Sequence, residues 1–182
     1  MRSVLDACVL FPSVTRSLLI GAAGFGAFEP IWSPRLLEEW HRAAMRKGEA
    51  EGATAKIEIA LLQSEWPDAS IHLPDHAEDG LSLPDPNDVH VLATAIEGGA
   101  SEIVTANISD FPMRVLAHHG ILRRHPDEFL LEIAGSNPSE FKELLVAVTQ
   151  QASDMAGKSL DQNILLKRAG LPRLAKYLRQ SA

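Results

Sequence analysis

The chain has 182 residues, of which 46% are hydrophobic and 23% are charged, a composition typical of a folded globular protein. The single cysteine excludes a disulfide framework, and the net charge of −7 argues against nonspecific binding of polyanions over the whole surface. No apolar run reaches the roughly 18 residues of a spanning helix, and Asp6 interrupts the apolar stretch that a signal peptide would need. We therefore expect no membrane association and a cytoplasmic location.

The first 125 residues alternate between short apolar runs and helical patterns. Helical spacing follows Pro12, Ser33 and Asp85, and also covers residues 54–66 and 113–118. Short strands are expected at residues 3–10, 31–32, 69–73, 102–105 and 121–122. This alternation predicts an α/β/α sandwich with a central, mainly parallel sheet of about four or five strands.

From about Pro126 onward the pattern is entirely helical. Helices are expected at residues 126–134, 138–152, 159–169 and 171–180. Breaks at Asn137-Pro138 and at Gly170-Leu171-Pro172 separate them. We therefore expect a core of residues 1–125 and a helical C-terminal extension, residues 126–182, packed on that core.

Polar side chains stand where the carboxyl ends of the predicted strands meet the following loops and helices. Because ligands bind beyond the carboxyl ends of parallel strands, residues from four separate segments would share one rim. They are Asp6, Glu38, Glu39, Asp85, Asp88, Asn107 and Asp110.

Several carboxylates on one rim repel each other unless a cation neutralises them. Oxygen ligands suit Mg²⁺ or Mn²⁺, and such sites commonly activate water against a phosphodiester. Asp6 carries the most weight, because a lone carboxylate in an apolar run is costly unless it is paired or metal-bound. Asp85 also fits a helix N-cap, and Asp88 and Asp110 also fit ordinary positions near a helix start or in a turn. The residues predict a phosphodiesterase that depends on a divalent metal.

Four segments, in this order, resemble the motifs of the PIN-domain ribonucleases, which include the VapC-type toxins of bacterial toxin–antitoxin systems. The segments are Val4–Leu10, Ser33–Trp40, Leu83–Ala95 and Ile103–Phe111, and the resemblance covers about residues 2–125. It implies a PIN-like nuclease core in residues 1–125.

The resemblance also implies which residues act. Asp6, Glu39 and Asp88 would be the catalytic metal ligands for Mg²⁺ or Mn²⁺, and Asp110 or Asn107 would be the fourth member. Supporting roles would fall to Thr105, Asn107, Asp85 and Arg16.

The activity implied by the resemblance is endonucleolytic hydrolysis of single-stranded RNA that leaves a 5′-phosphate and a 3′-hydroxyl. Cations that could bind RNA phosphates surround the second motif, namely Arg35, Arg42, Arg46 and Lys47. The basic segment 158–179 is a further candidate. The family also implies an antitoxin partner and a homodimer.

Two other functions stay open at this stage. A catalytically silent PIN-like module that binds RNA or protein is suggested by Asn107, which is an amide where some relatives have Asp, and by the negative charge of the core. A phosphohydrolase with Asp6 as a covalent nucleophile is suggested by the acid at the end of the first strand. The second acid that such enzymes need two residues later is Cys8 here.

Overall fold

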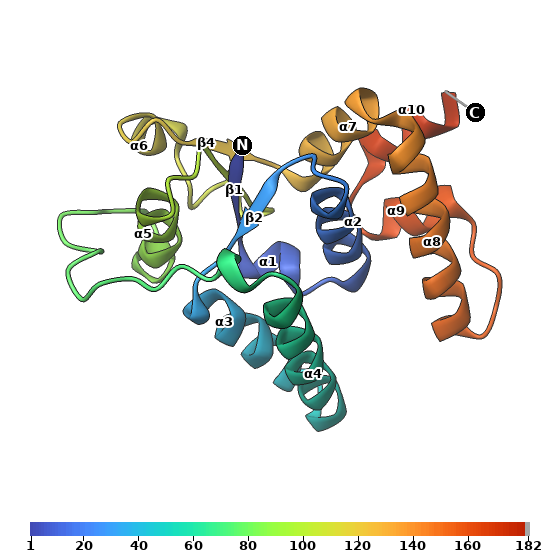
Figure 1. Ribbon diagram of the computed structural model, residues 1–182, viewed down its shortest axis with the longest axis horizontal. Coiled ribbons are helices and arrows are strands. Elements are labelled where there is room, and N and C mark those ends of the chain that lie inside the picture. Colours follow the sequence, from blue (N-terminus) through green and yellow to red (C-terminus); the bar gives the residue numbers. More distant parts are fainter. Residues whose placement is uncertain (181–182) are drawn as a thin grey trace. The chain divides into compact units, whose positions relative to one another are not determined.

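The computed structural model describes residues 1–180 and divides the chain into two compact units (Figure 1). The first unit consists of Met1–Phe11 and Glu29–Arg124. The second unit consists of Pro12–Phe28 and the chain from His125 onward. No helix formed by residues 1–180 combines the length and the apolar character needed to cross a membrane.

The first unit is built on a four-stranded sheet in which every pair of neighbours is parallel. The strands are β1 (Arg2–Leu5), β2 (Glu29–Ile31), β3 (Glu102–Val104) and β4 (Leu122–Arg124), in the order β2-β1-β3-β4. Together with its flanking helices this sheet confirms the predicted α/β/α class, and the C-terminal helices are also present. The strand order runs outward in both directions from β1 and β3. The topological switch point, where open parallel sheets bind ligands, therefore lies at the carboxyl ends of these two strands.

Helices pack around this sheet within the first unit. They are α1 (Ala7–Leu10), α3 (Pro34–Met45), α4 (Glu49–Glu65), α5 (Val89–Glu97) and α6 (Met113–Ala117), with 3₁₀ turns η1 (Pro67–Ala69) and η2 (Pro86–Asp88). Helix α3 begins as its sequence predicts, because the Ser33 hydroxyl accepts a hydrogen bond from the Leu36 N–H at 3.4 Å and Pro34 occupies the first position. Figure 1 shows α3 and α4 packed side by side.

The strands predicted at 31–32, 102–105 and 121–122 differ by one to two residues at their ends, and two other predicted strands differ more. The predicted strand at residues 3–10 ends at Leu5, since the Asp6 N–H makes the last sheet bond, to the Val104 carbonyl at 3.1 Å. The Asp6 carbonyl then accepts from the N–H groups of Val9 and Leu10, at 3.0 and 3.1 Å, which turns the chain into α1. The strand predicted at residues 69–73 is reduced to a single parallel bridge between Ser70 and Trp32. Its hydrogen bonds run from the Trp32 N–H to the Ala69 carbonyl at 3.0 Å and from the Ile71 N–H to the Trp32 carbonyl at 2.8 Å, and Trp32 follows the end of β2.

The second unit is helical. It contains α2 (Ser13–Gly24), α7 (Pro126–Ser136), α8 (Pro138–Ala156), α9 (Gln162–Arg168) and α10 (Pro172–Gln180). Helix α2 packs against α7 and α8, and Phe28 meets Phe129 edge-to-face at 4.9 Å. The helices predicted after Pro126 are therefore confirmed. The predicted division into a 1–125 core and a 126–182 extension stays a prediction, and residues 181–182 lie outside the described residues.

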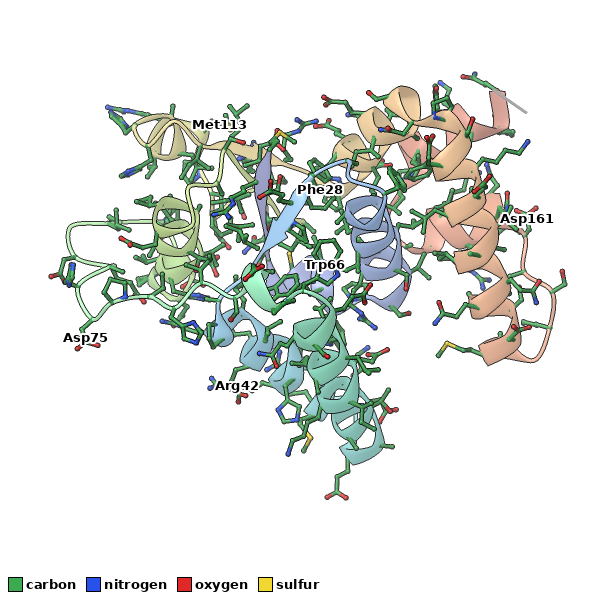
Figure 2. The ribbon with its side chains drawn as sticks, viewed as in Figure 1. Phe28, Arg42, Trp66, Asp75, Met113 and Asp161 are labelled. Carbon is green, nitrogen blue, oxygen red and sulfur yellow. The ribbon has the colours of Figure 1, made fainter. Side chains whose placement is uncertain are left out.

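We expect Asp127→Ala to weaken the second unit by about 2–3 kcal/mol in the free energy of unfolding. Asp127 is buried, and its two carboxylate oxygens accept from the N–H groups of Arg173 and Leu174, both at 2.9 Å, which caps α10. Asp161, labelled in Figure 2, is the matched control, because it is exposed and caps only its own helix α9. Its change to alanine should cost about 1 kcal/mol. Urea unfolding followed by circular dichroism measures both, and equal losses would contradict the expectation.

Candidate metal centre

The carboxyl ends of β1 and β3 bring Asp6 and Thr105 together. Leu5 and Val104 are register partners in the sheet, so the residues that follow them are neighbours. The Thr105 hydroxyl donates to Asp6 Oδ2 at 2.6 Å. Both residues are buried. The contact between Asp6 and Thr105 is therefore a direct consequence of strand order.

Cys8 supplies a second donor to Asp6. Its Sγ lies 2.9 Å from the same oxygen, Asp6 Oδ2. Burial, and then the negative charge of Asp6, raise the pKa of the Cys8 thiol to about 12. The thiol thus stays protonated at neutral pH and donates a weak hydrogen bond, and it is not a reactive thiolate.

A chain of hydrogen bonds continues from Thr105 to Asp88. The Asn107 backbone N–H donates to the Thr105 hydroxyl oxygen at 3.0 Å. The Asn107 side-chain amide donates to Asp88 Oδ2 at 3.2 Å. Asn107 therefore acts as a neutral donor that holds an acid.

One face of α3 contributes Glu39. Residues 39, 42, 43 and 46 follow helical spacing and line one pocket, whereas Leu36, Leu37 and Trp40 belong to the buried face. Glu39 Oε1 lies 2.9 Å from His90 Nε2 and 3.6 Å from Arg35 Nε. Helix phase thus separates Glu39, which faces the acids, from Glu38, which does not line that pocket.

These side chains surround a pocket of about 440 Å³ at the switch point. Its lining consists of Asp6, Ala7, Cys8, Phe11, Glu39, Arg42, Ala43, Arg46, Asn87, Asp88 and Asn107. Three acids predicted as metal ligands therefore share one pocket, together with two of the arginines predicted to bind phosphate.

The pKa of Asp88 indicates how strongly the acids interact. Its pKa is raised from 3.8 to about 6, first by burial and then by the charges of Asp6, Asp85, Asp110 and Glu39. Three carboxylates from other segments, together with Asp85 from the same turn, therefore act on one side chain. This is the repulsion that the sequence predicted for such a rim.

Asp85 and Asp110 gather on another side of Asp88. The nearest carboxylate oxygens of the three residues lie within 4.8 Å of one another, although Asp85 and Asp110 do not line the pocket. Asp85 Oδ1 accepts from the backbone and side-chain N–H groups of Asn87, at 2.9 and 3.0 Å, so it also stabilises the η2 turn. Asp88 is thus common to the pocket and to this second group of acids.

The donor set fits a hard divalent cation. In each of Asp6, Glu39 and Asp88, one carboxylate oxygen is held by the neighbours described above. Among residues 1–180, the other oxygen of each makes no hydrogen bond or ion pair. Fixed oxygen ligands with one coordinating atom free are what Mg²⁺ and Mn²⁺ sites require.

The remaining predicted residues lie in different surroundings. Arg42 and Arg46 line the pocket, and the Arg42 Nε donates to Glu38 Oε1 at 3.0 Å. Arg35 is exposed and donates to Glu78 Oε1 and to the Asn87 carbonyl, both at 3.2 Å. Lys47 Nζ lies 5.8 Å from the centre of the Phe11 ring and does not line the pocket.

Arg16, predicted in a supporting role, lies in α2 of the second unit. Its side chain is buried there. That role stays a prediction.

Sequence reasoning assigned no role to Cys8 or His90. Cys8 carried no signal, because a lone cysteine in an apolar run is most often a small core residue. His90 did carry one, since an imidazole between Val89 and Val91 on a buried helix needs a partner. Its partner could not be read from the sequence because Glu39 lies in a different motif.

Comparison with known families agrees with this geometry. A family model described as PIN domain matches residues 2–109. The chain therefore belongs to the PIN-domain family, whose members are generally metal-dependent nucleases. Neither a search of curated proteins nor a search of solved structures found a match.

We expect Asp88→Asn to stabilise the metal-free protein at pH 7. Because the pKa of Asp88 is raised to about 6, the folded state holds its proton more tightly than the unfolded chain does. Its contribution to stability therefore falls as the pH rises from about 4 through about 6. The gain at pH 7 should be about 1 kcal/mol, allowing for solvent screening of a half-buried group, and it should vanish near pH 4.

Chemical unfolding in EDTA at a series of pH values measures this gain. Asp75→Asn is the control, since Figure 2 shows Asp75 on the loop between η1 and η2, and it is exposed. It should leave stability unchanged. A loss of stability in Asp88→Asn at pH 7, or a gain that does not depend on pH, would contradict the electrostatic account.

Proposed function

We propose that the protein is an Mg²⁺- or Mn²⁺-dependent endoribonuclease and the toxin of a toxin–antitoxin pair. The observation that carries the nuclease proposal is the pocket shared by Asp6, Glu39 and Asp88 at the sheet's switch point. Membership of the PIN-domain family supports it. The toxin assignment rests on the resemblance of the four motifs to the VapC-type toxins.

In this proposal Asp6, Glu39 and Asp88 hold the cation through their free oxygens, and Asp110 is the fourth acid. When bound, a divalent ion supplies a lowered pKa for water and neutralises charge on the phosphate. Thr105 and Cys8 fix the orientation of Asp6 throughout. Asn107 does the same for Asp88.

The arginines beside the pocket indicate which class of substrate it binds. Arg42 and Arg46 follow Glu39 along the same helix face, roughly 4.5 and 10 Å farther along the axis at the usual helical rise. An anionic strand whose scissile phosphate meets the acids would thus place neighbouring phosphates near these guanidinium groups. Because the pocket is lined by arginines as well as by the acids that would hold the cation, it favours a polyanion over a small neutral substrate.

Further parts of the proposal concern the protein's context. An antitoxin would bind this chain, and two copies of the chain would form a homodimer in the cytoplasm. Growth arrest of a bacterial host after induced expression would support the toxin assignment. Its absence, when the purified protein cleaves RNA, would leave a ribonuclease without a toxin role.

We expect Glu39→Gln and Asp88→Asn to reduce Mn²⁺-dependent cleavage of a labelled single-stranded RNA by at least about 100-fold. The loss of a ligand should exceed the 10–100-fold cost of losing a group that supports one. Glu38→Gln is the matched control on the same helix turn, because Glu38 does not line the pocket. The products should carry 5′-phosphate and 3′-hydroxyl ends.

A wild-type protein that binds RNA without cutting it, with or without Mn²⁺, would instead identify the silent PIN-like module. Equal cleavage by the wild type and both pocket variants would show that the cleavage comes from a contaminant. Either result would end the nuclease proposal.

We expect Arg42→Ala and Arg46→Ala each to weaken RNA binding and raise KM, with little change in kcat. If each arginine contacts one phosphate, the slope of log K against log salt should fall by about one per substitution. Arg114→Ala is the control, because Arg114 is exposed on α6 and does not line the pocket. Unchanged salt slopes in both pocket variants would place the RNA elsewhere.

A further inference from the structure

His90 is a completely buried imidazole on α5, two residues after the acid Asp88. Its side chain is 0% exposed, and the residues beside it, Val89 and Val91, are buried core. Histidine is rarely enclosed to this degree without a hydrogen-bond partner, since an unmet buried polar atom costs free energy. We therefore expect a polar partner for the ring nitrogens.

Glu39 is a polar neighbour of the ring. His90 Nε2 lies 2.9 Å from Glu39 Oε1. The direction of the contact is not that of a well-aligned hydrogen bond, and among residues 1–180 neither ring nitrogen makes an aligned hydrogen bond elsewhere. Glu39 Oε1 is therefore the acceptor that a proton on Nε2 faces at 2.9 Å.

Glu39 needs such a neighbour more than the other acids do. Asp6 is buried and receives hydrogen bonds from a hydroxyl and a thiol, whereas the Glu39 side chain is 31% exposed and longer by one rotatable bond. Its other contact, Arg35 Nε at 3.6 Å, belongs to an exposed guanidinium that also binds Glu78 and the Asn87 carbonyl. Of these two contacts on Glu39 Oε1, the imidazole is the one that is fully buried.

We propose that His90 is a positioning residue that fixes Glu39 Oε1 and so presents Oε2 to the cation. The role uses only the Nε2–H group, which both the Nε2-protonated neutral tautomer and the imidazolium carry. It parallels the way Thr105 and Cys8 fix Asp6 and Asn107 fixes Asp88. The inference rests on the proposed function, since it gives Glu39 its place as a metal ligand.

Calorimetric titration of the full chain with Mn²⁺ tests this role through three substitutions of His90. Leucine fills the site without a donor and should weaken Mn²⁺ binding by about 10–100-fold. Glutamine carries its amide nitrogen about as far as Nε2 and should restore the affinity. Asparagine is equally polar, but its amide reaches only as far as Nδ1, so it should resemble leucine.

The Gln and Asn variants form the decisive pair if His90→Leu fails to fold, because both keep a buried polar group of similar character. Circular dichroism and the melting temperature in EDTA establish that the variants being compared are folded. His41→Leu is the matched control, since His41 Nδ1 lies 3.9 Å from Glu38 Oε2 on α3 and does not line the pocket. It should leave Mn²⁺ affinity unchanged.

A double-mutant cycle separates positioning from general structural support. In a Glu39→Gln background, His90→Leu should cause no further loss of Mn²⁺ affinity, because its effect passes through the Glu39 carboxylate. The same fold-loss in both backgrounds would overturn the role. So would wild-type affinity in His90→Leu, or equal affinities in the folded Gln and Asn variants.

The same titrations distinguish this inference from the proposed function. If the wild type binds no Mn²⁺, the proposed function fails and the positioning role fails with it. If the wild type binds Mn²⁺ and Asp88→Asn does not, while substitutions of His90 leave affinity unchanged, the metal site stands and only the role of His90 is wrong.

Discussion

The repulsion among carboxylates around Asp88 is the constraint on which the site depends. The sheet brings Asp6 to the end of a central strand, and Glu39, Asp85 and Asp110 also lie close to Asp88. Burial first, and then these four charges, raise the pKa of Asp88 to about 6. A fold gains nothing from gathering like charges in a partly buried place. A bound cation would supply the missing counter-charge and so account for the arrangement. The burial that strengthens the repulsion among the carboxylates would also strengthen their attraction for the cation.

The neighbours of the acids are consistent with this account. A carboxylate that only needed neutralising could use both oxygens in hydrogen bonds or ion pairs. Instead, the contacts of Asp6 fall on Oδ2, those of Glu39 on Oε1 and that of Asp88 on Oδ2. The contacts come from a hydroxyl, a thiol, an amide and an imidazole, and the exposed Arg35 adds a guanidinium. Mostly neutral donors restrain the ligands while leaving most of their charge for a cation.

The sequence predicted the parts of this site that depend on strand ends. Asp6 could be assigned because it interrupts an apolar run, and Asn107 and Asp110 because they follow a strand. The parallel sheet confirms the predicted fold class. The choice of Glu39 over Glu38 came from resemblance to a family. The helical periodicity of α3 could also have indicated it, since Leu36 and Trp40 mark the buried face. The extent of β1 was wrong because its apolar run continues into α1 without any change of composition.

What could not be predicted were contacts between residues of different motifs. The bond from Asn107 to Asp88 and the approach of His90 to Glu39 depend on how η2 and α5 sit over the ends of the strands, which no local pattern records. The bond from Asn107 also bears on the silent-module alternative. An aspartate at this position would add another negative charge beside Asp88, whereas the amide adds a donor and no charge. An amide at residue 107 is therefore compatible with a cation site, and by itself it is no argument for the silent module.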